Sequence, residues 1–222
     1  MKGRAIVSVG LLLVVGLALV ACDDGFSIGA GVRGSGTVVT ESRDVTSFDE
    51  IVVLGSGDVI VNVDGTESLT IEAEDNLMPL LTSNVRDGRL ELGSDGSFSA
   101  TKGIIYRISA ESLEGVEING SGDVTAAQID AASFDVTING SGNVEPAGSS
   151  DELTVEINGS GDYKGEDLIA ATGAVRVSGS GSALVNVTDS LDVDIAGSGD
   201  VAYMGDPTVT EDISGSGDVS RR

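Results

Sequence analysis

The chain of 222 residues carries 36 Asp and Glu against 12 Lys and Arg, which gives a formal net charge of −24. Such an acidic chain is repelled by nucleic-acid phosphates, so we expect no nucleic acid among its partners. The sequence has no His and a single Cys, which excludes Ser-His-Asp and Cys-His catalysis, conventional zinc sites and an internal disulfide.

The first residues have the pattern of an export signal. Residues 1–4 are basic and residues 5–18 form an apolar run, which is shorter than the roughly 20 residues of a membrane-spanning helix. The run closes with Leu-Val-Ala-Cys, which resembles the lipobox of bacterial lipoproteins. That resemblance implies cleavage before Cys22 and acylation of this residue, and more than one acyl chain anchors a protein stably. We therefore predict a lipoprotein signal peptide over residues 1–21, lipid attachment at Cys22 and a tether over residues 22–31.

A repeated Gly-Ser-Gly, often followed by Asp, organises the rest of the chain. From Gly120 onward, successive copies are separated by 20, 19, 20, 18 and 18 residues. Around most copies, apolar residues alternate with polar ones, which indicates strands with one buried face, and a fixed period near 20 is typical of repeat architectures. The copies begin at Gly34, Gly55, Gly120, Gly140, Gly159, Gly179, Gly197 and Gly215.

Each copy is predicted to form a strand, a Gly corner and a second short strand, followed by a more variable third segment. The predicted fold class is therefore all-β: a single-stranded, right-handed parallel β-helix, a solenoid of about 20-residue coils that covers residues 32–222. The hexapeptide period of left-handed β-helices is missing, and propeller blades need about twice this period. A β-sandwich is the other structural alternative.

Between Gly55 and Gly120 the repeat fades, although strand patterns and the turn dipeptides Asp64-Gly65 and Asp87-Gly88 persist. We predict degenerate coils over residues 59–113 and regular coils over residues 113–219. A separate inserted subdomain is the alternative for the first range. A solenoid whose last strand lies at residues 213–219 exposes a strand edge, which favours end-to-end homo-oligomers.

Stacking in register would align polar residues of successive coils. Asn119, Asn139 and Asn158, together with Ser121 and its equivalents, are predicted to form hydrogen-bonded ladders between coils.

Carboxylates follow most corners and form either a solvated row of turn residues or a row that bridges calcium. Neighbouring carboxylates ~4.8 Å apart in water repel by only about 1 kcal/mol, so the row requires no cation. We assign no catalytic, cofactor or metal residues. The row consists of Asp58, Asp123, Asp162, Asp200 and Asp218, interrupted by Asn143 and Ser182.

An ordered series of segments resembles a bacterial family of unknown function, the putative auto-transporter adhesin, head GIN domain. The resemblance extends over roughly Val32 to Val219. It implies a right-handed β-helix that is usually secreted or lipid-anchored. The matching segments are residues 48–53, 55–59, 69–73, 76–80, 85–90 and 117–123.

These patterns predict a non-enzymatic, lipid-anchored, extracytoplasmic module of the bacterial cell envelope, with an adhesin-like binding role or a structural role. The expected partners are a membrane through the N-terminal lipid, a glycan or envelope protein, and a second copy of the chain. Two alternatives stay open. One is a carbohydrate-active β-helix enzyme, although the basic residues are few and scattered. The other is an accessory protein of envelope assembly or stress.

Overall fold

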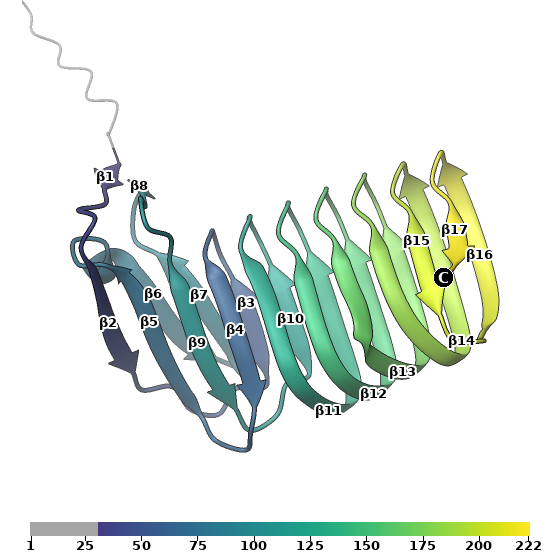
Figure 1. Ribbon diagram of the computed structural model, residues 1–222, viewed down its shortest axis with the longest axis horizontal. Helices are drawn as coiled ribbons and strands as arrows, with labels where there is room; N and C mark the ends of the chain where they lie inside the picture. The colour runs from purple at the N-terminus through teal and green to yellow at the C-terminus, as the bar shows by residue number, and fades with distance from the viewer. Residues whose placement is uncertain (1–30) are drawn as a thin grey trace, which may run out of the picture. The chain divides into compact units, whose positions relative to one another are not determined.

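The computed structural model describes residues 31–222 as one all-β unit (Figure 1). The predicted signal peptide, Cys22 and all but the last residue of the tether lie outside the described residues. Within residues 31–222, no helix has the length and apolar character that crossing a membrane requires.

The regular elements of residues 31–222 are strands, apart from one short 3-10 helix. In chain order the elements are β1 (Val32–Arg33), β2 (Val38–Arg43), β3 (Glu50–Val53), β4 (Asp58–Val63), β5 (Ser68–Glu74), the 3-10 helix η1 (Met78–Leu80), β6 (Leu81–Arg86), β7 (Arg89–Ser94), β8 (Phe98–Ser99), β9 (Ile105–Ala110), β10 (Gly115–Ile118), β11 (Asp123–Ile138), β12 (Val144–Ile157), β13 (Tyr163–Val177), β14 (Ala183–Gly197), β15 (Val201–Met204), β16 (Thr208–Gly215) and β17 (Val219–Arg221).

Parallel pairing between successive coils builds the solenoid. We call sheet 1 the strand segments that follow a Gly corner: β4, the first parts of β11 to β14, β15 and β17. Sheet 2 contains the segments that precede a corner: β3, β10, the last parts of β11 to β14, and β16. In sheet 1 the register joins Val124, Val144, Tyr163, Ala183, Val201 and Val219, with the same spacing as the Gly-Ser-Gly copies. The predicted all-β parallel solenoid is confirmed.

The variable third segment of each coil belongs to the long strands. β11 to β14 have 14 to 16 residues each, and they run from one Gly corner to the next. Shifts in register interrupt the pairing of these long strands, for example between Ala126 and Ile129. Such irregularities bend a strand without ending its pairing.

The predicted degenerate coils over residues 59–113 describe only part of this region. β7 and β9 form one coil, and they pair in parallel with β3 and β4. β5 instead pairs antiparallel with β2 and β9, and β6 pairs antiparallel with β7. The chain reverses between β6 and β7 at Asp87-Gly88, where both residues have a positive φ, as a type I′ hairpin turn requires. The region is therefore one coil plus antiparallel strands that cover the first end of the solenoid.

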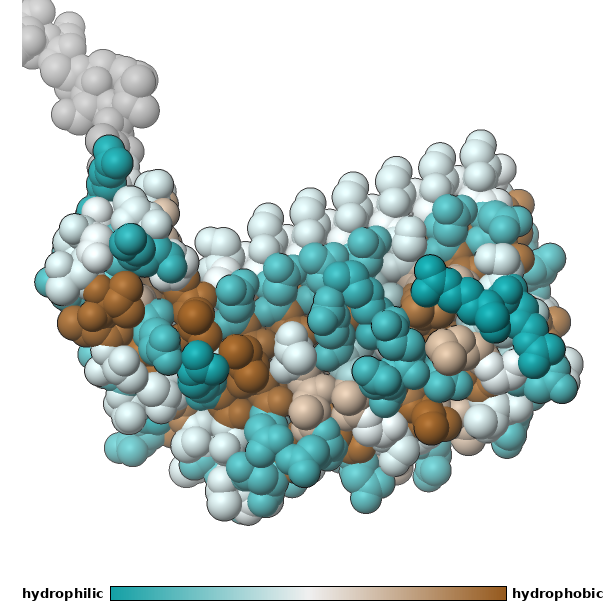
Figure 2. All heavy atoms as spheres, in the orientation of Figure 1, coloured by the Kyte–Doolittle hydropathy of each residue, from teal (hydrophilic) through white to brown (hydrophobic). Residues whose placement is uncertain are grey.

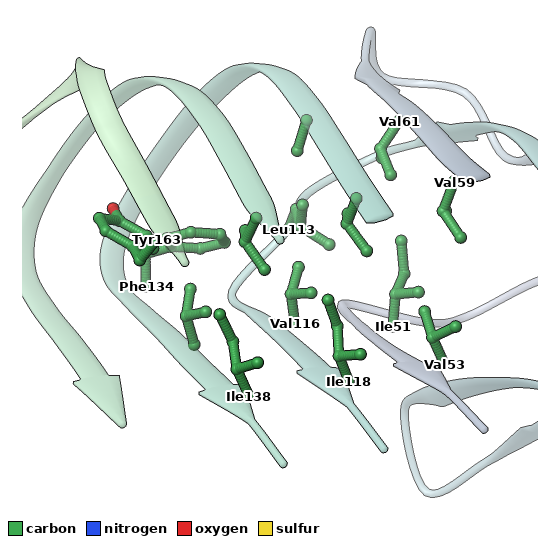
Figure 3. Packing of buried hydrophobic residues seen from close by; sticks show 14 of the residues in the cluster. Ile51, Val53, Val59, Val61, Leu113, Val116, Ile118, Phe134, Ile138 and Tyr163 are labelled. Carbon is green, nitrogen blue, oxygen red and sulfur yellow. The ribbon is translucent and has the colours of Figure 1, made fainter. Parts of the chain in front are cut away.

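The interior is a continuous column of small apolar side chains. Val116, Ile118 and Ile138 are almost completely buried, and Figure 3 shows them pointing into the space between the sheets. Ile118 and Ile138 occupy equivalent positions in successive coils. At the stacked corners from Gly120 onward there is room only for glycine. A methyl group on Gly142 would overlap the carbonyl oxygen of Gly122 in the preceding coil. Stacked glycines thus allow successive corners to approach each other closely.

Candidate functional surface

The Gly-Ser-Gly corners stack through their backbone. The N–H of Ser141 donates to the carbonyl oxygen of Gly120 at 2.9 Å, and the N–H of Ser160 donates to that of Gly140 at 2.8 Å. The serine side chains themselves are exposed. Figure 2 shows a regular row of protrusions along the edge where Figure 1 draws the turns between coils. Backbone groups therefore form the serine ladder, and the hydroxyl groups line an exposed ridge.

The predicted asparagine ladder is confirmed. Nδ2 of Asn139 donates to Oδ1 of Asn119 at 2.9 Å, and Nδ2 of Asn158 donates to Oδ1 of Asn139 at 3.0 Å. Nδ2 of Asn119 also donates to the carboxylate of Glu117 at 2.7 Å. The ladder ends at the next coil, where Ser178 takes the place of asparagine. Its role is to hold neighbouring corners in register.

The row of acidic residues after the corners also bonds between coils. Oδ1 of Asp123 accepts hydrogen bonds from the backbone N–H and the side-chain amide of Asn143, at 2.9 and 2.8 Å. Oδ1 of Asp162 accepts the N–H of Ser182 at 2.9 Å. The row thus fits turn residues that accept hydrogen bonds from the next coil. In the part of the chain that the structure describes, no three His, Cys, Asp or Glu side chains are grouped to hold a metal ion.

Two open hollows lie along this row on the outer face of sheet 1, with volumes of about 360 and 480 Å³. The first is lined by Asp58, Asp123 and Glu145, among others, and Lys164 lines both. Hydrophilic side chains gather across this face in Figure 2. Since oxygen atoms predominate among these polar groups, the hollows suit ligands that carry hydroxyl or ammonium groups.

Lys164 is the central cation of this face. Its Nζ donates to Oε1 of Glu145 at 2.7 Å, and this hydrogen bond raises the pKa of the lysine. A lysine that serves as a general base requires a lowered pKa, because it must lose its proton near neutral pH. Lys164 therefore stays charged and acts as a positioned cation. In the sequence the basic residues are few and scattered, and no pattern singles out Lys164.

Other basic side chains are also engaged at the surface. Arg107 pairs with Glu72 at 2.9 Å, and Arg176 approaches Asp194 at 3.6 Å. Exposed pairs of this kind contribute little to stability.

Sequence reasoning missed the buried carboxylate of Glu74, whose exposed fraction is 0%. It accepts hydrogen bonds from the N–H of Gly36 at 2.6 Å and from the N–H and hydroxyl of Thr101 at 2.8 and 2.6 Å. A methyl group on Gly34 would overlap this carboxylate. The first Gly-Ser-Gly copy is therefore a loop around Glu74 and lies outside the stack of corners.

Comparison with known proteins identifies a matching family and solved structures with a similar fold. The family described as putative auto-transporter adhesin, head GIN domain, matches residues 47–207. A putative adhesin from Bacteroides fragilis is 23% identical with a TM-score of 0.72, and the match covers 86% of this chain and 100% of that chain. A putative lipid binding protein from Parabacteroides distasonis is 22% identical with a TM-score of 0.53, over 86% of this chain and 99% of that chain. No curated protein matches the chain.

The two solved structures share the fold of this chain. The family match spans more than half of the sequence and includes β3 to β15. The chain therefore belongs to the putative auto-transporter adhesin, head GIN domain family.

Proposed function

We propose that the protein is a non-enzymatic module of the bacterial cell envelope that is lipid-anchored through Cys22 and binds envelope or surface partners in an adhesin-like manner. The observation that carries this proposal is the outer face of sheet 1. There, two open hollows flank a single charged lysine, and hydrogen bonds between coils fix the polar side chains. Such a face is built for contact with a large ligand that lies across several coils.

The side chains of this face support binding without turnover. Lys164 is paired with Glu145, and hydrogen bonding raises its pKa. The hollows are open, so they do not exclude water as electrostatic catalysis requires. Tyr163 is buried, so its ring is not available to stack on a sugar. Recognition therefore depends on hydrogen bonds and charge, which suits a glycan with free hydroxyl or amino groups, or a basic segment of an envelope protein.

A capture experiment with matched variants tests this face. The full chain is immobilised in detergent and incubated with solubilised envelope material. The double variant Glu145→Gln/Lys164→Met removes one acid and one base from sheet 1, and Glu156→Gln/Arg176→Met removes the same pair of charges from sheet 2. We expect the first variant to lose the captured partner and the second to retain it. Equal capture by both variants would contradict the assignment of this face.

Anchoring is tested separately by fractionation. Cys22→Ser removes the thiol that the acyl chain would modify, so the variant should move from the membrane fraction to the soluble fraction if export and cleavage proceed. If a processed Cys22→Ser chain stays in the membrane fraction, the proposed lipid anchor is wrong. This result would not bear on the binding face.

A further inference from the structure

The last coil carries a charge at a position that is apolar in the preceding coils. Glu211 lies in register with Val193 of β14, and residues paired in a parallel sheet share a face. Its side chain is therefore in the inward register, and it is exposed only because it lies in the last coil of the stack. The equivalent residues in the five preceding coils are buried valines: Val116, Val136, Val155, Val175 and Val193.

The two ends of the solenoid are closed to different degrees. At the first end, η1 follows the buried Leu77, and the guanidinium of Arg43 donates to the carbonyl oxygens of Leu81 and Met78 at 2.8 and 3.3 Å. At the other end, β16 pairs with β14 and β17 pairs with β15, and no strand within residues 31–222 pairs with their outer sides. Ile213 is 38% exposed there. We call these two outer sides the C-terminal edge.

The C-terminal edge presents backbone groups that could pair. In sheet 2, the carbonyl oxygen of Ile138 accepts the N–H of Asn158, and that of Ile157 accepts the N–H of Ser178 in the next coil. The register and the alternation of a strand therefore direct the N–H and C=O of Glu211 and Ile213 outward. An edge of this kind is a template for another strand.

We propose that Glu211 protects the C-terminal edge against pairing with a second copy of the chain, so that the unmodified chain stays a single copy instead of forming the end-to-end homo-oligomers that an exposed edge alone would favour. A strand added to β16 would cover the carboxylate of Glu211 beside Val193. No Lys or Arg within residues 31–222 forms an ion pair with this carboxylate. Burying an unpaired charge in an apolar interior is strongly unfavourable.

The charge of Glu211 acts most strongly against pairing between two copies of this chain. A second copy that approaches through its own C-terminal edge brings a second Glu211 to the contact. Removing the carboxylate leaves Val209, the substituted residue and Ile213 as one apolar row, as in the preceding coils. Inward-pointing charges on edge strands are a known protection against edge-to-edge association.

The test compares the masses of full-length chains in a detergent solution by native mass spectrometry. We expect the unmodified chain to have the mass of one copy, and Glu211→Val to have the mass of two or more copies. Asp212→Val is the matched control, because it removes the neighbouring carboxylate from the outward face and should keep the mass of one copy. Glu211→Ile repeats the apolar substitution in case the first variant folds poorly, which circular dichroism would reveal.

Glu211→Pro separates the effect of charge from that of backbone pairing. It removes the carboxylate and also the outward N–H, which makes no hydrogen bond to β14, so it should keep the mass of one copy. The proposal is overturned if the unmodified chain already pairs through this edge. It is overturned equally if folded Glu211→Val and Glu211→Ile keep the mass of one copy, or if Glu211→Pro or Asp212→Val associates as readily as Glu211→Val.

Discussion

Asp123 and Asn143 join consecutive coils through one carboxylate oxygen. Oδ1 of Asp123 accepts both the backbone N–H and the side-chain amide of Asn143, at 2.9 and 2.8 Å. We expect Asp123→Ala to lower the free energy of unfolding by about 1 kcal/mol, since each exposed bond contributes modestly. Asp123→Asn keeps an acceptor oxygen and should cost less. Urea titration of both variants measures the difference, and equal losses would show that the acceptor is unimportant.

The hydrogen bonds of Asp123 also bear on whether the row of acidic residues binds calcium. Because the oxygen of Asp123 accepts hydrogen bonds from the next coil, the row of acidic residues is stable without a cation. The melting temperature should therefore be the same in excess calcium and in excess chelator. A clear rise with calcium would instead support bridging between the carboxylates.

Tyr163 places a hydroxyl group in the apolar interior, where it makes no hydrogen bond to any of residues 31–222, and its burial raises the pKa of the phenol. Tyr163→Phe removes this unsatisfied group and should raise the free energy of unfolding by about 1 kcal/mol. Tyr106→Phe is the control, because Tyr106 is also buried but its hydroxyl is not among the unsatisfied buried groups of residues 31–222. A loss of stability in Tyr163→Phe would reveal a hydrogen-bond partner for the hydroxyl.

Gly142 tests the stacking of the corners. Its substitution by alanine brings a methyl group onto the carbonyl oxygen of Gly122, and only backbone movement can relieve this overlap. We expect Gly142→Ala to lower the free energy of unfolding by about 3 kcal/mol or more. Ser141→Ala changes the adjacent exposed residue and should leave stability nearly unchanged. Similar effects of both substitutions would contradict the close contact of the corners.

Glu74 should make stability depend on pH. Hydrogen bonds, first of all from the side chain of Thr101, lower the pKa of its carboxyl group in the folded protein. A lowered folded pKa stabilises the protein above the unfolded pKa, and this stabilisation is lost as the pH falls through the folded pKa. Glu74→Gln should therefore be less stable at neutral pH, and the difference should shrink in acid. Urea titrations at neutral and at acid pH measure it, with the half-buried Glu72, which pairs with Arg107, as the neighbouring control in Glu72→Gln. A difference that is the same at both pH values would contradict the role of the ionised carboxylate.

The sequence predicted the regular coils well because their pattern is local. The alternation around Gly120 and its later copies is repeated in the register of β11 to β14, and the asparagine ladder follows from that register. Pairing partners in the first part of the chain depend on distant contacts. The Gly-Ser-Gly at Gly34 has the same local pattern, yet Glu74 holds it in a loop. The antiparallel pairing of β5 depends in the same way on β2 and β9.

The candidate surface was predictable only in part. The repeat of Gly-Ser-Gly and the alternation of inward and outward residues place Asp58 and Asp123 in one row, as the register confirms. The pairing of Lys164 with Glu145 depends on two features. The coil length of 19 residues brings the two side chains into line, and the turn of each long strand decides where they lie. Glu211 could have been recognised from the sequence, because it occupies a position that is valine in five preceding coils.

The most direct test of the proposed function measures binding and turnover on the same ligands. The full chain in detergent is applied to an array of envelope and host glycans, and each bound glycan is then incubated with the chain and analysed for cleavage. The proposal predicts binding that weakens in Glu145→Gln/Lys164→Met and no cleavage products. Cleavage of a bound polysaccharide by the unmodified chain, and its loss in that variant, would contradict a non-enzymatic role.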